Sequence, residues 1–328
     1  MKSSAKLNGI LFFHDFFCYL LLLSTVYCLL STAAHAAGPG ATSGTSLKND
    51  IGAKSAAMGG AFTAHQGDIN CLSYNPAGIA PIETREVSLS HTNSFVDTTY
   101  NSILFAMPSR YGGFGASINY FDAGKLELVM LDGTEKTVKA QQDIAAGISW
   151  GARADGIADY FEINTTISFG VTLKYFSSEI AEAATAKAYT GDIGMILRIF
   201  ETTESRLNFG AAAQNLTGTL KYISDEESLP RQIRSGFSLL TPIGMERFSG
   251  MLNADVIYQM NEKKTHPRIG LELATDNYAF RIGNKFNYGA QSLSLGCGYI
   301  REPLKIDYAF SLARDLDDQH RITLGVGF

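Results

Sequence analysis

Few side chains in this sequence could carry out chemistry, and those few are scattered. The histidines beyond the first 36 residues show no metal-binding spacing of the HExxH or CxxC kind: His65, His91, His266 and His320. The nearest arrangement to a hydrolase pair is His91 with Ser88 or Ser90, and neither serine lies in a GxSxG turn. The sequence also has no phosphate-binding loop and no GxGxxG stretch. We therefore expect no enzyme: no catalytic residues, no metal site and no cofactor.

The four cysteines do not form a disulfide framework. Cys18 and Cys28 fall in an apolar N-terminal stretch, and Cys71 and Cys297 are far apart in the sequence. The latter two could pair in an oxidising compartment, but two small buried thiols is the expectation we favour.

The first 36 residues are typical of a cleaved export signal. Lys2 and Lys6 form a short basic start, an apolar run spans residues 17–31, and Ala34-His35-Ala36 is a small-x-small cleavage site. An N-terminal anchor is the alternative, but a core of about 15 residues is short for a membrane helix. The net charge of −5 argues against a nucleic-acid partner. We therefore predict an exported protein with its signal peptide at residues 1–36.

The rest of the sequence is dominated by alternation of apolar and polar residues. In residues 161–176, FEINTTISFGVTLKYF, every second residue from Ile163 to Tyr175 faces one way, and the polar residues between them face the other way. A period of two residues does not fit one face of a helix and predicts a long strand.

The same pattern recurs and predicts fourteen strands. They are centred on residues 85–93, 99–108, 116–120, 144–150, 161–176, 189–199, 207–211, 233–239, 252–258, 269–273, 278–282, 293–299, 306–312 and 322–328. An even number of strands lets a sheet close into a barrel and removes the edges that lipid would not tolerate. We predict an all-β, fourteen-stranded antiparallel transmembrane barrel over residues 85–328.

A soluble β-sandwich or lipocalin-like barrel is the structural alternative. Against it, aromatic residues recur on the apolar face near strand ends, as in the girdles of membrane barrels: Tyr120, Trp150, Tyr175, Tyr189, Tyr258, Tyr299 and Tyr308. The last strand ends on Phe328, a signal of the kind read by the outer-membrane assembly machinery. We therefore predict location in the outer membrane of a Gram-negative type of cell.

The connections are expected to alternate between short turns, such as 301–304 and 274–277, and longer polar loops, such as 217–230. The hairpin at 126–140, with Lys125, Lys136 and Lys139, is expected to project beyond the membrane. Solvated loops are the expected place for two acidic clusters, with divalent cations bridging to lipopolysaccharide as the alternative: Asp225-Glu226-Glu227, and Asp315, Asp317 and Asp318.

The segment before the first strand has a different character. Residues 49–80 lack strand alternation and carry five glycines, which allow close packing against a wall: Gly52, Gly59, Gly60, Gly67 and Gly78. Asp68 could cap a short helix through Cys71-Leu72-Ser73, and Pro76 should keep Asn75 out of the helical region. We predict an N-terminal hatch, or plug, at residues 37–84 inside the mouth of the barrel.

This segment, NDIGAKSAAMGGAFTAHQGDINCLSYNPAGIA, resembles the N-terminal signature of the PorV/PorQ family, which is related to FadL-type outer-membrane transporters. Matches to the IGxxxxAMGGAfxA block are Ile51, Gly52, Ala57, Met58, Gly59, Gly60, Ala61, Phe62 and Ala64; the second block matches at Tyr74, Asn75, Pro76, Ala77 and Gly78. Shorter matches occur at 213–218, 229–239, 304–312 and 320–328. The chain departs from the family at 65–68, where two acidic residues are usual, and at Tyr74, where Trp is common.

The resemblance implies a barrel that binds or passes hydrophobic, fatty-acid-like molecules through a lumen gated by the hatch. Apolar contacts of the hatch or its ligand are expected at Met58, Phe62, Leu72 and Ile79; structural roles in the hatch motif are expected at Gly52, Gly59, Gly60, Asn75, Pro76, Ala77 and Gly78. The alternative it implies is a barrel that does not transport and serves as a partner in a type IX-like protein secretion system. The signature does not separate these two functions.

Overall fold

The computed structural model describes residues 42–94, 97–130, 133–154, 165–244, 248–287, 291–313 and 318–328. Chain contacts divide the protein into two units, residues 1–36 and 37–328. The predicted signal peptide, residues 1–36, lies outside the described residues. The fold described below is that of the second unit.

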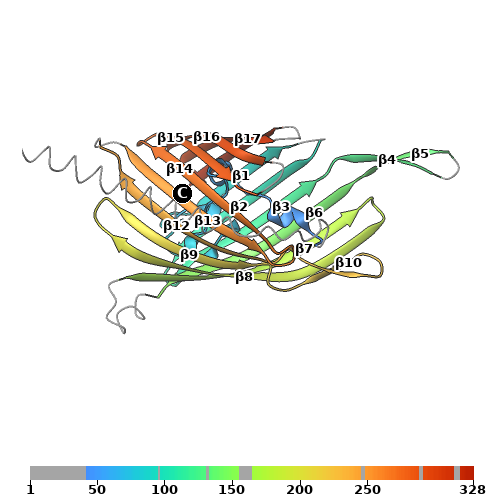
Figure 1. The fold of residues 1–328 in the computed structure, drawn as a ribbon, viewed down its shortest axis with the longest axis horizontal. Helices are drawn as coiled ribbons and strands as arrows, with labels where there is room; N and C mark the ends of the chain where they lie inside the picture. Colours follow the sequence, from blue (N-terminus) through green and yellow to red (C-terminus); the bar gives the residue numbers. More distant parts are fainter. Residues whose placement is uncertain are drawn as a thin grey trace, which may run out of the picture. The chain divides into compact units, whose positions relative to one another are not determined.

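The described strands of this unit form one closed, antiparallel, fourteen-stranded barrel (Figure 1). Each strand pairs with its neighbours along the barrel, and β1 pairs with β18 to close it. The strands are β1 (Glu86–Asn93), β2 (Thr99–Ser109), β3 (Gly112–Asp122), β6 (Gln141–Arg153), β7 (Thr166–Ile180), β8 (Ala184–Glu201), β9 (Arg206–Gln214), β12 (Gln232–Pro242), β13 (Ser249–Gln259), β14 (Lys264–Ala274), β15 (Tyr278–Lys285), β16 (Gln291–Arg301), β17 (Leu304–Ala313) and β18 (Gln319–Gly327).

Each of the fourteen predicted strands overlaps one barrel strand, so the predicted fold class is confirmed. The prediction at 161–176 ended too early: β7 covers Thr166–Ile180. Its continuation pairs with β8 through residues 177–180, where the apolar alternation that guided the prediction has ended. Residues 161–164 lie outside the described part of the chain.

The apolar face of the strands points outward. In β7, Phe169, Val171 and Leu173 are exposed, whereas the intervening Ser168 and Thr172 are buried. A soluble barrel would bury the apolar face, so the soluble alternative is wrong for this arrangement. Outward apolar and inward polar residues are the pattern of a transmembrane barrel. Among the described residues, no helix is long and apolar enough to cross a membrane.

Both ends of the barrel sequence, Glu86 and Phe328, lie at one end of the barrel, where the Phe328 amide donates to the Arg85 carbonyl at 2.8 Å. We call this the terminal end and the opposite one the loop end. Two hairpins lie outside the barrel sheet at the loop end: β4 (Lys125–Val129) with β5 (Glu135–Lys139), and β10 (Thr219–Lys221) with β11 (Glu226–Ser228). Figure 1 shows β4 and β5 extending past the barrel strands, as predicted for 126–140.

The predicted alternation of short and long connections holds only in part. Connections 181–183 and 260–263 at the loop end are short, whereas 154–165 at the terminal end is long. The loop-end connections are short where neighbouring strands pair to their tips, as Ile180 does with Ala184.

Residues 42–84, which we call the N-terminal segment, contain four short helices. They are η1 (Thr45–Lys48), α2 (Ala53–Ala57), η2 (Ile69–Ser73) and η3 (Pro76–Ile79). The side chain of Asp68 caps η2 by accepting from the Asn70 amide at 2.8 Å, and Asn75 is extended ahead of Pro76. Both local predictions are therefore confirmed.

Candidate functional site

The N-terminal segment packs against a set of strand glycines. At nine glycines among the described residues, an added Cβ would lie 1.9–2.6 Å from an atom of the segment, far inside contact distance: Gly113, Gly115, Gly151, Gly170, Gly194, Gly210, Gly270, Gly283 and Gly296. They come from eight strands around the barrel and from the face opposite the exposed apolar residues. The segment therefore runs along the inner wall, and these positions have room for it only because they lack side chains.

The path of the segment follows from its contacts. It begins at the loop end, where Ser46 donates to Asp143 of β6 at 2.5 Å and Lys48 pairs with Glu262 at 2.6 Å. It ends at the terminal end, where Ile79 lies against Gly113 at the start of β3. The chain thus crosses the barrel interior from the loop end to the terminal end before entering β1.

The four predicted apolar contacts all lie in this packing. Met58, Phe62 and Ile79 are 0% exposed and Leu72 is 2% exposed. Met58 lies against Gly270 and Leu72 against Gly115 of the wall. In this state these side chains contact protein atoms, and their role toward a ligand stays a prediction.

The predicted hatch motif supplies the local geometry. Gly52, Gly59 and Gly60 have positive φ, and a Cβ on Gly60 would collide with Arg268 and Asp50. The Asn75 side chain caps η3 and donates to the Thr63 carbonyl at 2.7 Å and to the Met195 carbonyl of β8 at 3.2 Å. It therefore ties two parts of the segment to each other and to the wall. The other three motif residues are buried in or beside η3: Pro76, Ala77 and Gly78.

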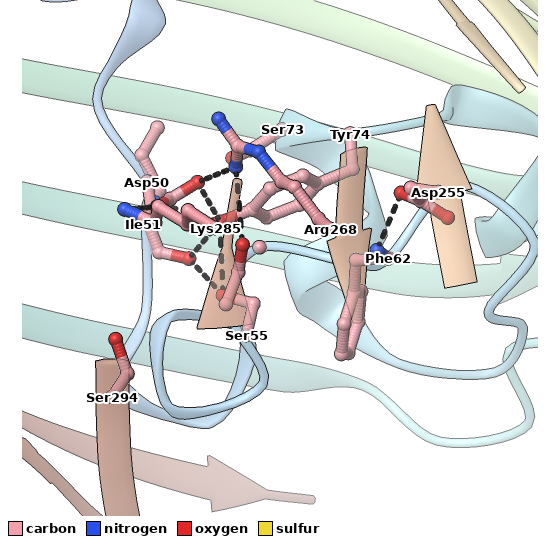
Figure 2. A network of polar contacts seen from close by, with 12 residues as sticks. Asp50, Ile51, Ser55, Phe62, Ser73, Tyr74, Asp255, Arg268, Lys285 and Ser294 are labelled. Atoms are coloured by element: carbon pink, nitrogen blue, oxygen red, sulfur yellow. Dashed lines mark hydrogen bonds and ion pairs between the residues drawn. The ribbon is translucent and has the colours of Figure 1, made fainter. Parts of the chain in front are cut away.

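A buried carboxylate joins the first part of the segment to the wall. Asp50 pairs with Arg268 of β14 at 2.7 Å and with Lys285 of β15 at 2.6 Å (Figure 2). The Tyr74 hydroxyl lies 3.3 Å from the same carboxylate. Burial raises the pKa of Asp50, but the charges of Lys285 and Arg268 outweigh burial and hold this pKa well below its usual range. Asp50 is therefore ionised at any physiological pH.

A second buried carboxylate belongs to the wall and accepts hydrogen bonds from the segment. Asp255 of β13 accepts from the amides of Phe62 and Thr63 at 2.9 and 3.0 Å and from the Thr63 hydroxyl at 2.6 Å. Arg234 of β12 pairs with Asp255 at 3.3 Å and donates to the Gly60 carbonyl at 2.7 Å. Figure 2 shows Asp255 beside Phe62. The backbone at 60–63 is thus hydrogen-bonded to two strands.

Within the segment itself, an ion pair between Lys54 and Asp68 lies beside the ring of His65. Lys54 pairs with Asp68 at 2.9 Å, and the His65 ring lies 3.8 Å from Asp68. Burial, reinforced by the charge of Lys54, lowers the pKa of His65 to about 4. His65 is therefore neutral at pH 7. No group of three potential metal ligands occurs among the described residues.

The remaining candidate chemistry is dispersed by the fold. Ser88 and Ser90 face inward, whereas His91 faces outward and contacts Asn101 at 2.7 Å, so they form no hydrolase pair. Cys71 and Cys297 are both free, which rules out pairing in this structure. Cys71 is buried as expected, but Cys297 is exposed because it occupies an outward position on β16.

An apolar cluster lies at the loop end of the barrel. Leu220 and Leu229, from the connection that contains β10 and β11, are fully buried against Phe176 of β7, and Leu47 of the segment packs on the same cluster. Sequence analysis missed this cluster, the two carboxylate anchors and the wall glycines. The glycines did leave a signal, because they recur at polar-face positions of otherwise regular strands, as Gly170 does in β7.

A closed fourteen-stranded barrel with an apolar outer face defines a class of transmembrane barrel. Its fold is that of the Ralstonia pickettii toluene transporter TbuX, at TM-score 0.56 and 16% identity over 85% of this chain and 98% of that chain. A Pseudomonas aeruginosa FadL homologue matches at a TM-score of 0.50 and 11% identity, over 85% of this chain and 98% of that chain. The monoaromatic hydrocarbon channel CymD matches at a TM-score of 0.52 and 11% identity, over 84% of this chain and 96% of that chain. By sequence, the chain belongs to the uncharacterised protein family UPF0164, whose model matches residues 24–228. No curated protein matches the sequence significantly.

Proposed function

We propose that this protein is an outer-membrane barrel that binds or passes hydrophobic, fatty-acid-like small molecules, and that residues 37–84 act as its hatch. The observation that carries the proposal is the fit between residues 57–79 and the nine wall glycines. Any side chain at these nine positions would overlap atoms of the segment, so the wall and the segment fit each other only with glycine there. The toluene transporter, the FadL homologue and the hydrocarbon channel named above share the fold.

The mechanism requires no covalent chemistry. In the observed state the segment lies along the inner wall, and we propose that a solute passes after the segment shifts. The contacts that hold the segment are hydrogen bonds, ion pairs and apolar packing, and each can be broken and remade. The proposal places the protein in the outer membrane, which it reaches through its export signal. There it contacts lipopolysaccharide, after the assembly machinery has recognised the strand that ends in Phe328.

The proposal is tested in cells that lack the protein. We expect slower uptake of a long-chain fatty acid and of a monoaromatic hydrocarbon, with unchanged protein secretion, and rescue of uptake by the wild-type gene. Mass spectrometry of the purified barrel should find a co-purifying hydrophobic molecule. Loss of secreted proteins with normal uptake, and a co-purifying polypeptide, would instead support a partner of a secretion system and contradict the proposal.

A further inference from the structure

The hairpin of β4 and β5 has no neighbouring strand on either of its outer edges among the described residues. It forms a separate two-stranded sheet and extends past the barrel strands at the loop end (Figure 1). Two strands alone are only marginally stable in water, and an unpaired strand edge is a template for another strand. Two apolar side chains of β4 are also exposed, Val129 at 72% and Leu126 at 47%. The hairpin is therefore suited to pair with another chain.

The base of the hairpin is fixed to the barrel, so its free edge is held in one place. The Ala140 amide donates to the Gly124 carbonyl at 2.9 Å, and the Ala181 amide, between β7 and β8, donates to the Ala140 carbonyl at 3.0 Å. The Lys139 amide donates to the Glu182 carboxylate at 3.1 Å. An edge that is already ordered loses little conformational entropy when it binds.

The backbone groups on the outer edge of β5 belong to alternate residues. The Lys139 amide points away from β4, so the amides and carbonyls of Thr137 and Glu135 point the same way. The Thr134 carbonyl, by contrast, points across the hairpin and accepts from the Met130 amide at 2.8 Å. A strand that added to β5 would therefore form its main-chain hydrogen bonds with Glu135, Thr137 and Lys139.

The side chains along this edge are self-complementary. β5 reads Glu135-Lys136-Thr137-Val138-Lys139, and only Val138 of the five is buried. When a second copy of β5 runs antiparallel to the first with Thr137 opposite Thr137, each Glu135 lies opposite Lys139 of the other copy. Opposite charges and threonines in directly opposed positions stabilise a sheet. The same arrangement of β4, centred on Glu127, would oppose two carboxylates, so the charges favour the β5 edge.

This pairing also relieves an unfavourable contact within the single hairpin. Lys125 lies directly opposite Lys139, and like charges in such positions destabilise a sheet. Glu135 of the same hairpin does not help, because it lies opposite Val129. Glu135 of a second copy would lie on the other side of Lys139. Charged edges normally keep other strands away, but this pattern admits a strand of its own sequence.

We propose that the β5 edge binds the β5 edge of a second copy of this chain, antiparallel and centred on Thr137. Because the hairpin continues away from the barrel (Figure 1), antiparallel pairing turns the second copy end over end, and the two barrels meet loop end to loop end. Barrels within one membrane point the same way, so the contact joins barrels in two facing membranes. Both hairpins that leave the barrel sheet lie at the loop end, and the longer excursions of outer-membrane barrels are extracellular. This inference goes beyond the proposed function and does not depend on transport.

The experiment measures the mass of the purified full-length barrel in detergent by analytical ultracentrifugation. The wild type should dimerise as its concentration rises. Glu135→Lys and Lys139→Glu should each weaken dimerisation by about tenfold or more, because like charges then face each other in both cross-strand pairs. An equimolar mixture of the two variants should dimerise like the wild type, because each pair again joins opposite charges. Lys136→Glu, on the other face of β5, should match the wild type.

A cross-link and a vesicle assay test the register and the orientation. In a Cys297→Ser background, which removes the exposed native thiol, Thr137→Cys should form a disulfide-linked dimer on oxidation. Glu127→Cys, on the β4 edge, should not. Lipid vesicles that carry the wild type should aggregate, and vesicles that carry either charge variant should not. Mixing the two sets of variant vesicles should restore aggregation.

Each outcome supports or overturns a part of the proposal. Heat-dependent gel mobility verifies that every variant is a folded barrel. A wild type that stays monomeric at all concentrations would overturn the contact, as would dimers that persist unchanged in both charge variants. Dimers in detergent without aggregation of vesicles would overturn the arrangement between facing membranes. Uptake of hydrophobic molecules enters none of these measurements, so a failure here leaves the proposed function untouched.

Discussion

Asp255 is the residue on which the attachment of the segment to the wall depends most. One carboxylate oxygen accepts from two backbone amides and one hydroxyl of the segment, and the side chain is 0% exposed. Buried donors that lose their acceptor cost free energy because water cannot replace it. Arg234 would also lose its partner, and a buried charge without its counter-ion is a further cost.

The substitution Asp255→Ala should therefore loosen residues 60–64 without opening the barrel sheet. We expect the free energy of local opening at the Phe62 and Thr63 amides to fall by about 3–5 kcal/mol, measured by hydrogen exchange. Glu86→Ala removes a carboxylate that does not contact the segment and should leave exchange at these amides unchanged. Equal protection in Asp255→Ala and wild type would contradict the role given to Asp255.

His65 makes the seating of the segment depend on pH. Its pKa is lowered from 6.5 to about 4 in the seated segment, so a released segment takes up a proton that the seated one excludes. Seating should therefore weaken as pH falls below 6.5 and level off below about 4. Protease cleavage of the segment, measured between pH 7 and pH 5, should rise on acidification. His65→Gln should flatten this rise, whereas His320→Gln, on the outer face, should not. Cleavage with the same pH dependence in His65→Gln would refute the assignment.

At the scale of elements, each strand has an outer face and an inner face with different residue types. Outward positions are largely apolar for the membrane. Inward positions are largely polar, with glycine where the segment packs closely and apolar residues such as Leu104 and Ile196 at some others. In β6, Gly151 lies against Pro76 and Ile79 of the segment, whereas Gly147 faces only side chains of the wall strands. In β7, Leu173 is 66% exposed on the outer face, and Ser177 lies nearer the loop end of the same face.

The role of the apolar outer face can be tested on β7 alone. Leu173→Arg should destabilise the barrel in lipid vesicles by about 2–4 kcal/mol, because a charge near the middle of the bilayer is poorly solvated. Ser177→Arg, near the membrane surface, should cost about 0–1 kcal/mol. Urea unfolding in vesicles measures both. Equal destabilisation by the two substitutions would mean that β7 does not cross the membrane as described.

At the scale of the whole molecule, the fold could be predicted from the sequence, whereas the polar contacts inside the barrel could not. Alternation with a period of two is set by each strand and its surroundings, so fourteen strands could be counted without knowing which strands pair. The contacts of Asp50 with Arg268 and Lys285 join residues more than 200 positions apart, and no local pattern reports such a contact. The prediction that Cys297 is buried was wrong for a related reason. The outer face of a membrane barrel is apolar, so a small apolar side chain can lie on that face and still be exposed.

The most direct test of a hatch seated on wall glycines is the ion conductance of the reconstituted barrel in a planar bilayer. Gly170→Val/Gly194→Val places two side chains where Asn75, Pro76 and Ala77 now lie, and should displace the segment. Gly147→Val adds the same bulk to the inner wall away from the segment. We predict that conductance rises several-fold in the double variant and stays at the wild-type level in Gly147→Val. A folded double variant that conducts no more than the wild type would contradict the central claim.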